Sequence, residues 1–117
     1  MATQIVHGDG PIYIVHVTGT GDTTVDVSAL NGVAALDKVV CLKAEVSSSA
    51  LTDVSLAWVA TANVTFASIG LNDSHVFNWE GEGGIRNNAG AGVTGDIVVD
   101  VTGTGNFSAT LWLRKQA

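Results

Sequence analysis

The sequence has little charge, one proline and a single cysteine. Only 14% of its 117 residues are charged, whereas a typical soluble domain carries about 25%. Cys41 has no second cysteine to pair with, so a disulfide framework within the chain is excluded. No apolar run approaches the roughly 18 residues that a membrane-spanning helix needs. We therefore expect one domain over residues 1–117 and no membrane partner.

Positive charge is especially scarce. The chain has 5 Lys and Arg against 11 Asp and Glu, which gives a formal net charge of −6. A nucleic-acid-binding protein needs a basic stripe to replace the counterions of the phosphates, so we expect no nucleic-acid partner. The first ten residues have neither a basic start nor an apolar stretch, so we expect no secretory signal and synthesis in a reducing cytoplasm.

Valine, glycine, alanine and threonine are the most frequent residues. Valine and threonine favour strands, and glycine favours the tight turns that join them. Apolar alternation bounded by turn residues recurs every 8–12 residues. This pattern predicts an all-β fold, an antiparallel eight-stranded β-sandwich of jelly-roll type. Residues 81–95 contain six glycines and are expected to form a long irregular loop. The predicted strands cover 12–18, 23–28, 38–46, 53–59, 63–69, 75–80, 96–102 and 107–114.

Two local pairings and one face assignment follow from this pattern. We predict a hairpin between 53–59 and 63–69, and a last hairpin between 96–102 and 107–114. The sequence VTGTG occurs at 17–21 and again at 101–105, and we interpret it as one hairpin connector used twice. In the strand over 38–46, the alternation places four side chains on one face: Val40, Leu42, Ala44 and Val46.

Several predicted strands are apolar on both faces, notably 12–17, 39–42, 56–59 and 111–113. One face of such a strand can fill the core of a sandwich, and the other face needs a cover. Loops of the same chain could supply part of that cover, but a neighbouring subunit is the reading we prefer. Exposed strands of this kind otherwise aggregate. The sequence thus predicts an assembling protein.

Catalytic chemistry has little support in the sequence. The three histidines do not have the spacing of a zinc site. Cys41 lies within an apolar strand, where a small unreactive thiol is usual. The nearby acid pairs Asp22/Asp26 and Glu80/Glu82 fit turn roles better than general acid–base chemistry. We expect no catalytic residue, no metal and no cofactor, and hence no enzyme.

Contact residues are expected on the two-faced strands and in the glycine-rich loop. Trp79 borders that loop and could anchor an interface, and the guanidinium of Arg86 could pair with a carboxylate. Trp112 lies in an apolar strand, where burial in the core or at an interface is expected. The predicted interface residues are Tyr13, Val15, Trp79, Ile85, Arg86, Asn87, Asn88 and Trp112.

Two segments resemble a known group of proteins. The stretch GGIRNNAGAGVTGDI at 83–97 and the ending LWLRK at 111–115 are similar to small virion structural proteins of tailed bacteriophages. DVSAL at 26–30 and LAWVAT at 56–61 are further points of similarity, although Val59 stands where that family often has an aspartate. The resemblance implies a jelly-roll decoration (cement) protein on the capsid surface. It would bind the major capsid protein, bridge its subunits and assemble as a homo-oligomer, with a trimer favoured.

Two other functions remain open from the sequence. Trp79 and the loop at 81–95 would also suit a receptor- or glycan-binding component of a head fibre or tail. A small hydrolase or lectin-like domain of jelly-roll type is the other alternative, and it lacks a credible acid–base pair.

Overall fold

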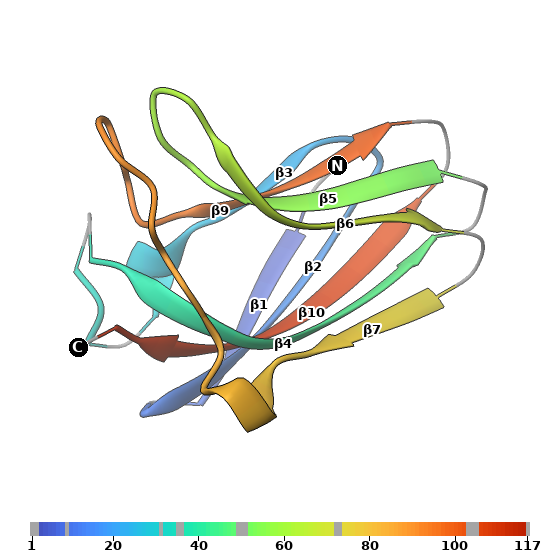
Figure 1. The fold of residues 1–117 in the computed structure, drawn as a ribbon. Helices are drawn as coiled ribbons and strands as arrows, with labels where there is room; N and C mark the ends of the chain where they lie inside the picture. The colour runs from blue at the N-terminus through green and yellow to red at the C-terminus, as the bar shows by residue number, and fades with distance from the viewer. Residues whose placement is uncertain are drawn as a thin grey trace.

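The computed structural model describes residues 3–8, 10–30, 32–34, 37–48, 52–71, 74–102 and 106–116. The described chain is all-β, with ten strands in two antiparallel sheets (Figure 1). Sheet A has the order β1 (Thr3–His7), β2 (Ile12–Gly19), β10 (Phe107–Lys115), β4 (Val39–Ser48), β7 (Ser74–Asn78), and β8 (Ile85–Arg86) also pairs with β4. Sheet B has the order β3 (Thr23–Val25), β9 (Ile97–Thr102), β5 (Thr52–Trp58), β6 (Val64–Leu71).

All eight predicted segments contain a strand, so the sequence located these elements correctly. The predicted number is too low, because β1 and β8 were not foreseen. Within the described residues, helix is limited to two three-residue 3-10 turns, Val27–Ala29 and Glu80–Glu82, and neither could reach across a lipid bilayer. The predicted pairing of 53–59 with 63–69 is confirmed as β5 with β6.

The core lies between the two sheets and is filled by alternate residues of each strand. Tyr13, Val15 and Val17 of β2 point inward, and the intervening residues are at least partly exposed. Strand β10 alternates in the same way, with Leu111 and Leu113 completely buried. Burial of each such side chain contributes about 1.5–3 kcal/mol to the stability of the fold.

The predicted last hairpin is wrong, because β9 belongs to sheet B and β10 to sheet A. The two VTGTG segments therefore do not close hairpins. Each one follows a strand of one sheet and leads to a strand of the other, from β2 to β3 and from β9 to β10. Phe107 pairs with Gly19, so both crossings lie at the same end of the sandwich. Residues 103–105 of the second segment lie outside the described residues.

The predicted face of β4 is also wrong, because the strand contains a register shift. Its partner Trp112 pairs with Lys43, but Leu113 pairs with Cys41, so Leu42 is an extra residue. Such a bulge moves every later side chain to the opposite face. Ala44 and Val46 lie in the core together with Cys41 and Val39, not with Val40.

Val40 is covered from the other side of sheet A by the loop that follows Glu80–Glu82. A Cβ atom added at Gly84 would collide with the Val40 side chain and come within 3.0 Å of the Leu42 side chain and of the Cys41 carbonyl oxygen. Part of the second apolar face of β4 is therefore covered by the chain's own loop. From there the segment up to Asp96 runs across one end of the sandwich to sheet B (Figure 1).

Candidate functional site

The outer face of sheet A is the surface that carries large apolar side chains. Two rows cross it, each made of directly paired residues: His7, Ile14, Trp112, Lys43 and Asn78, and beside them Ile5, His16, Thr110, Glu45 and Val76. Ile5 and Val76 are 52% and 46% exposed, and Ile12 is 47% exposed on the same face. Ile14 and Trp112 are half-buried between them. This face could bury apolar area against a partner.

Polar contacts hold the middle of this face in place. The Nζ atom of Lys43 lies 4.9 Å from the centre of the Trp112 ring, a cation–π contact. His16 Nδ1 and Thr110 Oγ1 are 2.8 Å apart and share a hydrogen bond. Nη2 of Arg114 donates to the Gly83 carbonyl oxygen at 3.4 Å. The contact with Lys43 restricts the indole of Trp112 on one side, which lowers the entropy that a contact through it would cost.

Five of the eight predicted interface residues fall into three groups, in the core, in β8 and on the outer face of sheet A. Tyr13 and Val15 are core residues, 5% and 0% exposed, so neither can reach a partner of the folded chain. Ile85 and Arg86 form β8, where Arg86 is exposed opposite Val40. Trp112 lies on the outer face of sheet A.

Asn87 and Asn88 differ in environment although they are adjacent. Asn88 is exposed, whereas Asn87 is only 3% exposed. The Oδ1 atom of Asn87 accepts a hydrogen bond from the Ala89 N–H at 3.0 Å, and the Asn87 N–H donates to Gln116 Oε1 at 2.9 Å. Asn87 therefore orders the loop and ties it to the end of β10, a structural role.

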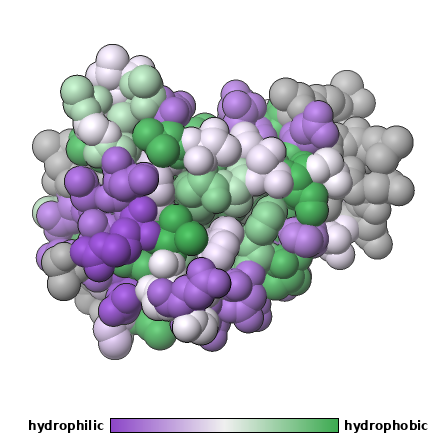
Figure 2. All heavy atoms as spheres, viewed as in Figure 1, coloured by the Kyte–Doolittle hydropathy of each residue, from purple (hydrophilic) through white to green (hydrophobic). Residues whose placement is uncertain are grey.

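Trp79 is part of an aromatic cluster that closes the side where β6 and β7 approach each other. Its ring stacks on Phe77 at 5.5 Å and 9°, and Phe66 lies 6.0 Å away. Phe66 in turn stacks on the buried Trp58 at 4.4 Å. The ring faces of Trp79 are thus largely used within the chain. On this side of the molecule, Figure 2 shows hydrophobic residues interrupted by hydrophilic ones.

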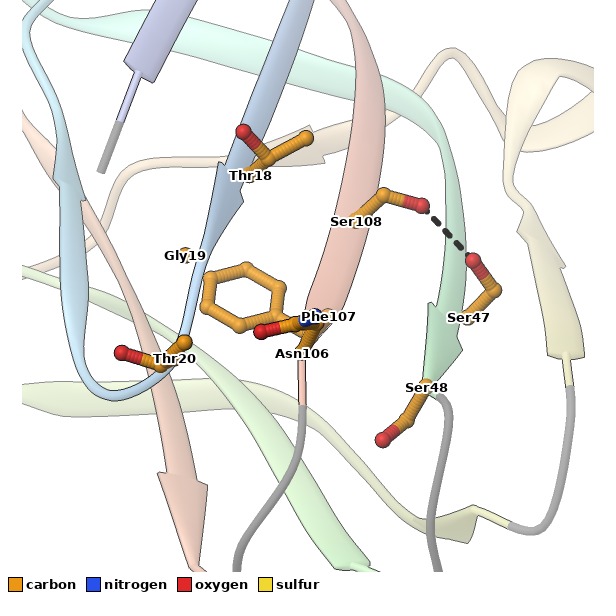
Figure 3. Close-up of a pocket in the computed structure, with 8 residues that line it drawn as sticks. All are labelled: Thr18, Gly19, Thr20, Ser47, Ser48, Asn106, Phe107 and Ser108. Atoms are coloured by element: carbon orange, nitrogen blue, oxygen red, sulfur yellow. Dashed lines mark hydrogen bonds between the residues drawn. The ribbon is translucent and has the colours of Figure 1, made fainter. Parts of the chain in front are cut away.

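A pocket of about 470 Å³ lies at the end of sheet A where the two VTGTG segments cross between the sheets. Its lining is rich in hydroxyl groups and has no charged side chain. The Oγ atoms of Ser47 and Ser108 are hydrogen-bonded at 2.7 Å, and the Phe107 ring lies beside Gly19 (Figure 3). The lining residues are Thr18, Gly19, Thr20, Ser47, Ser48, Asn106, Phe107 and Ser108.

Burial and close contacts change the ionisation of Cys41 and Asp100. Burial raises the pKa of the Cys41 thiol to about 12, so this thiol stays protonated. A hydrogen bond with the Asp22 side chain raises the pKa of the Asp100 carboxyl, and burial adds to the effect. Among the residues that the structure describes, no three His, Cys, Asp or Glu side chains come together as a metal site would require.

Sequence reasoning missed Ile5, Ile12, Ile14 and Val76 as surface residues. The signal was present in β2, whose two faces are both apolar, but the alternation alone does not say which set of side chains faces the core. For Ile5 and Val76 the signal was weaker, because β1 was not predicted and β7 is short.

Comparisons with known proteins do not assign this chain. No protein-family model and no curated protein matches the sequence. Among solved structures, one similar chain is peruvianin-I, a cysteine peptidase from Thevetia peruviana latex, with 12% identity and a TM-score of 0.38. The alignment covers all of this chain and 62% of the peptidase chain, so this chain spans less than two thirds of that protein. A similarity this low says nothing about the activity of this protein.

Proposed function

We propose that this chain is a non-enzymatic structural protein of a tailed-phage particle, a decoration protein that binds the outer surface of the capsid and bridges major capsid subunits. The observation that carries the proposal is the outer face of sheet A, where Ile5, Ile12 and Val76 are about half exposed although the core is already full. An exposed apolar face on a charge-poor domain is typical of a protein that binds a partner. The resemblance of 83–97 and 111–115 to virion proteins supports the choice of that partner.

We also propose that the sandwich is a jelly roll. Its support is a nested set of antiparallel pairs, β2 with β10, β3 with β9, β4 with β7, and β5 with β6. The chain therefore pairs as one long hairpin that crosses repeatedly between two four-stranded sheets, which is the jelly-roll topology. On this interpretation β1 and β8 are additions at the margins of sheet A.

Assembly as a homo-oligomer, with a trimer favoured, is part of the proposal. Closed symmetry would cover strand edges and part of the exposed apolar surface. It would also let each molecule contact several capsid subunits at once, and such multivalency converts weak contacts into lasting attachment.

The test compares particles of the phage that encodes this chain, with the gene intact and with the gene deleted. We expect the deleted particles to assemble but to lose DNA at lower temperature and under milder osmotic shock, and added purified protein to restore their resistance. Sedimentation of the purified protein should give a mass above that of a 12.0 kDa monomer. A monomer whose deletion leaves particle stability unchanged would contradict the proposal.

A glycan-binding role is the second candidate, favoured by the hydroxyl-lined pocket at the end of sheet A. Neutral hydroxyl and amide groups can both donate and accept hydrogen bonds, as recognition of a sugar requires. Binding to a glycan array that is lost on Ser108→Ala and kept in the exposed-surface variant Thr24→Ala would support this role. An array without any signal would remove it.

A further inference from the structure

The charged side chains are divided unequally between the two sheets. All 5 Lys and Arg residues lie in strands of sheet A or immediately before β4. The strands of sheet A contain one acidic residue, Glu45, whereas the four strands of sheet B contain Asp53 and Asp100 and no basic residue. Asp37, which precedes Lys38, forms an ion pair with Lys115 at 3.3 Å, and Glu80 and Glu82 follow β7, so these acids offset part of the charge near sheet A. Lys43 and Arg114 remain as cations of its outer face, whereas the described residues on the outer face of sheet B include aspartates and no cation. The basic residues are Lys38, Lys43, Arg86, Arg114 and Lys115.

The two outer faces also differ in the kinds of side chain that they expose. Every large apolar side chain that the described residues leave exposed belongs to sheet A. On sheet B, the paired rows across the outer face consist of small or hydroxylated side chains and an aspartate: Thr24, Val98, Ala57 and Thr65, and beside them Asp100, Ser55 and Ser68. Sheet B resembles a surface kept in water, whereas sheet A combines apolar side chains with cations.

We infer that sheet A is the face that seats on the capsid, and that it fits a protein surface presenting apolar side chains framed by carboxylates. This inference rests on the proposed function and adds the docking face and the chemistry of the partner surface. Lys43 lies on β4 directly beside Trp112, and Arg114 lies two residues further along β10 beside Ile12, so carboxylates of the partner would meet them as the apolar residues are covered. Sheet B then faces the solvent, where its aspartates keep the particle surface hydrated.

A second copy of this chain is a poorer partner for the outer face of sheet A than the capsid surface. A symmetric contact between two sheet A faces would bring the same cations together, and like charges across an interface are repulsive. A contact between sheet A of one copy and sheet B of the next would be complementary in charge. These two faces are on opposite sides of the sandwich, however, so such contacts would continue into an open stack instead of a closed oligomer.

The size of the face predicts weak attachment of a single copy. The five strands have 5, 8, 9, 10 and 5 residues, and at about 3.4 Å rise and about 4.8 Å spacing they give an area on the order of 600 Å². A standard stable interface buries about 800 Å² on each partner. Durable attachment would therefore require several copies seated on neighbouring capsid subunits at once.

The test measures binding of the purified full-length protein to capsids of the encoding phage that lack it. Ile12→Ser and Arg114→Glu change paired, exposed residues of sheet A, and Val98→Ser and Thr24→Glu are their counterparts on sheet B. We expect about tenfold weaker binding for each sheet A variant, and binding within about twofold of wild type for both counterparts. Raising the salt from about 50 to about 500 mM should weaken wild type more than Arg114→Glu, because salt screens the charge contacts.

Other outcomes separate the inference from the function. Loss of binding in the sheet B variants alone would overturn the docking face and leave the decoration role standing. Failure of wild type to bind capsids would overturn both. Stacks of purified protein that dissolve with either set of variants would assign sheet A to a second copy and overturn the inference, as would tighter binding to DNA or anionic vesicles than to capsids. Unfolding midpoints of all four variants identify any loss caused by misfolding.

Discussion

The side-chain amide of Gln4 is hydrogen-bonded to both backbone polar groups of Asp26. Its Nε2 donates to the Asp26 carbonyl oxygen at 3.1 Å, and the Asp26 N–H donates to Gln4 Oε1 at 2.9 Å. Gln4 belongs to β1 of sheet A, and Asp26 directly follows β3 of sheet B. The Gln4 carboxamide therefore links sheet A to sheet B at the edge of the sandwich formed by β1.

Replacing Gln4 by alanine should destabilise the fold by about 1 kcal/mol. Two hydrogen bonds are lost, and each contributes about 0.5–1.5 kcal/mol, with the lower end expected at this exposed position. Urea unfolding measures the change. Thr24→Ala, on the neighbouring exposed face, is the control and should stay within about 0.5 kcal/mol. Equal effects of the two variants would mean that the amide bridge does not stabilise the fold.

Alanine at three nearby glycines should separate backbone strain from steric collision. Gly81 has neither a positive φ nor a neighbour in reach, Gly83 has φ +82° and open space, and Gly84 has φ +91° and would collide with Val40. We expect almost no change for Gly81→Ala, about 1 kcal/mol of destabilisation for Gly83→Ala, and about 2–4 kcal/mol for Gly84→Ala. Thermal unfolding of the three variants measures the loss of stability in each. If Gly84→Ala destabilises the fold no more than Gly83→Ala, the loop does not pack closely against Val40.

Cys41 should resist thiol reagents in the folded protein. With a pKa of about 12, only about one thiol in ten thousand is ionised at pH 8, and the thiolate is the reactive form. A disulfide-exchange reagent at pH 8 should therefore react at least about a thousandfold more slowly with the folded chain than with the chain in urea. Comparable rates in the two conditions would contradict the burial of this side chain.

The contact between the Asp22 and Asp100 carboxyl groups should stabilise the fold at low pH, where most paired carboxylates lose their stabilising effect. The hydrogen bond with Asp22 raises the pKa of Asp100 above its usual value of 3.8. An acid whose pKa is higher in the folded state binds more protons there, so this contact stabilises at low pH and the contribution is lost as pH rises through the folded pKa. Asp22→Asn should then stabilise the fold at pH 7 by less than about 1 kcal/mol, because exposed charges are screened.

The gain from Asp22→Asn should shrink as the pH falls through the raised pKa of Asp100, because Asp100 then becomes protonated. The asparagine keeps the acceptor that receives the Val101 N–H at 3.0 Å, so only the charge and a donor change. Urea unfolding at pH 7 and pH 3.5 measures the difference. An identical effect at both pH values would show that the two carboxyl groups do not interact.

Local pattern predicted the strands and one pairing, β5 with β6, but not the partners of β10. The segments around Leu56 and Leu111 have an apolar period of two, which any half-buried strand satisfies, so their existence could be predicted. The prediction of the last hairpin failed because β10 pairs with β2 and β4, whose residues are about 60 to 100 positions away in the chain. The face of β4 failed because one extra residue at Leu42 reverses the alternation, and a bulge has no obligatory sequence signal.

The sequence by itself determined that this protein is a charge-poor all-β domain with strands at these eight segments. These properties follow from composition and from a period of two, both of which are local. Only the tertiary structure decided that Tyr13 and Val15 fill the core while Ile12 and Ile14 lie outside, and that the basic residues gather on one sheet. The physical reason is that a strand apolar on both faces can pack either way, and the choice depends on contacts with strands far away in the chain.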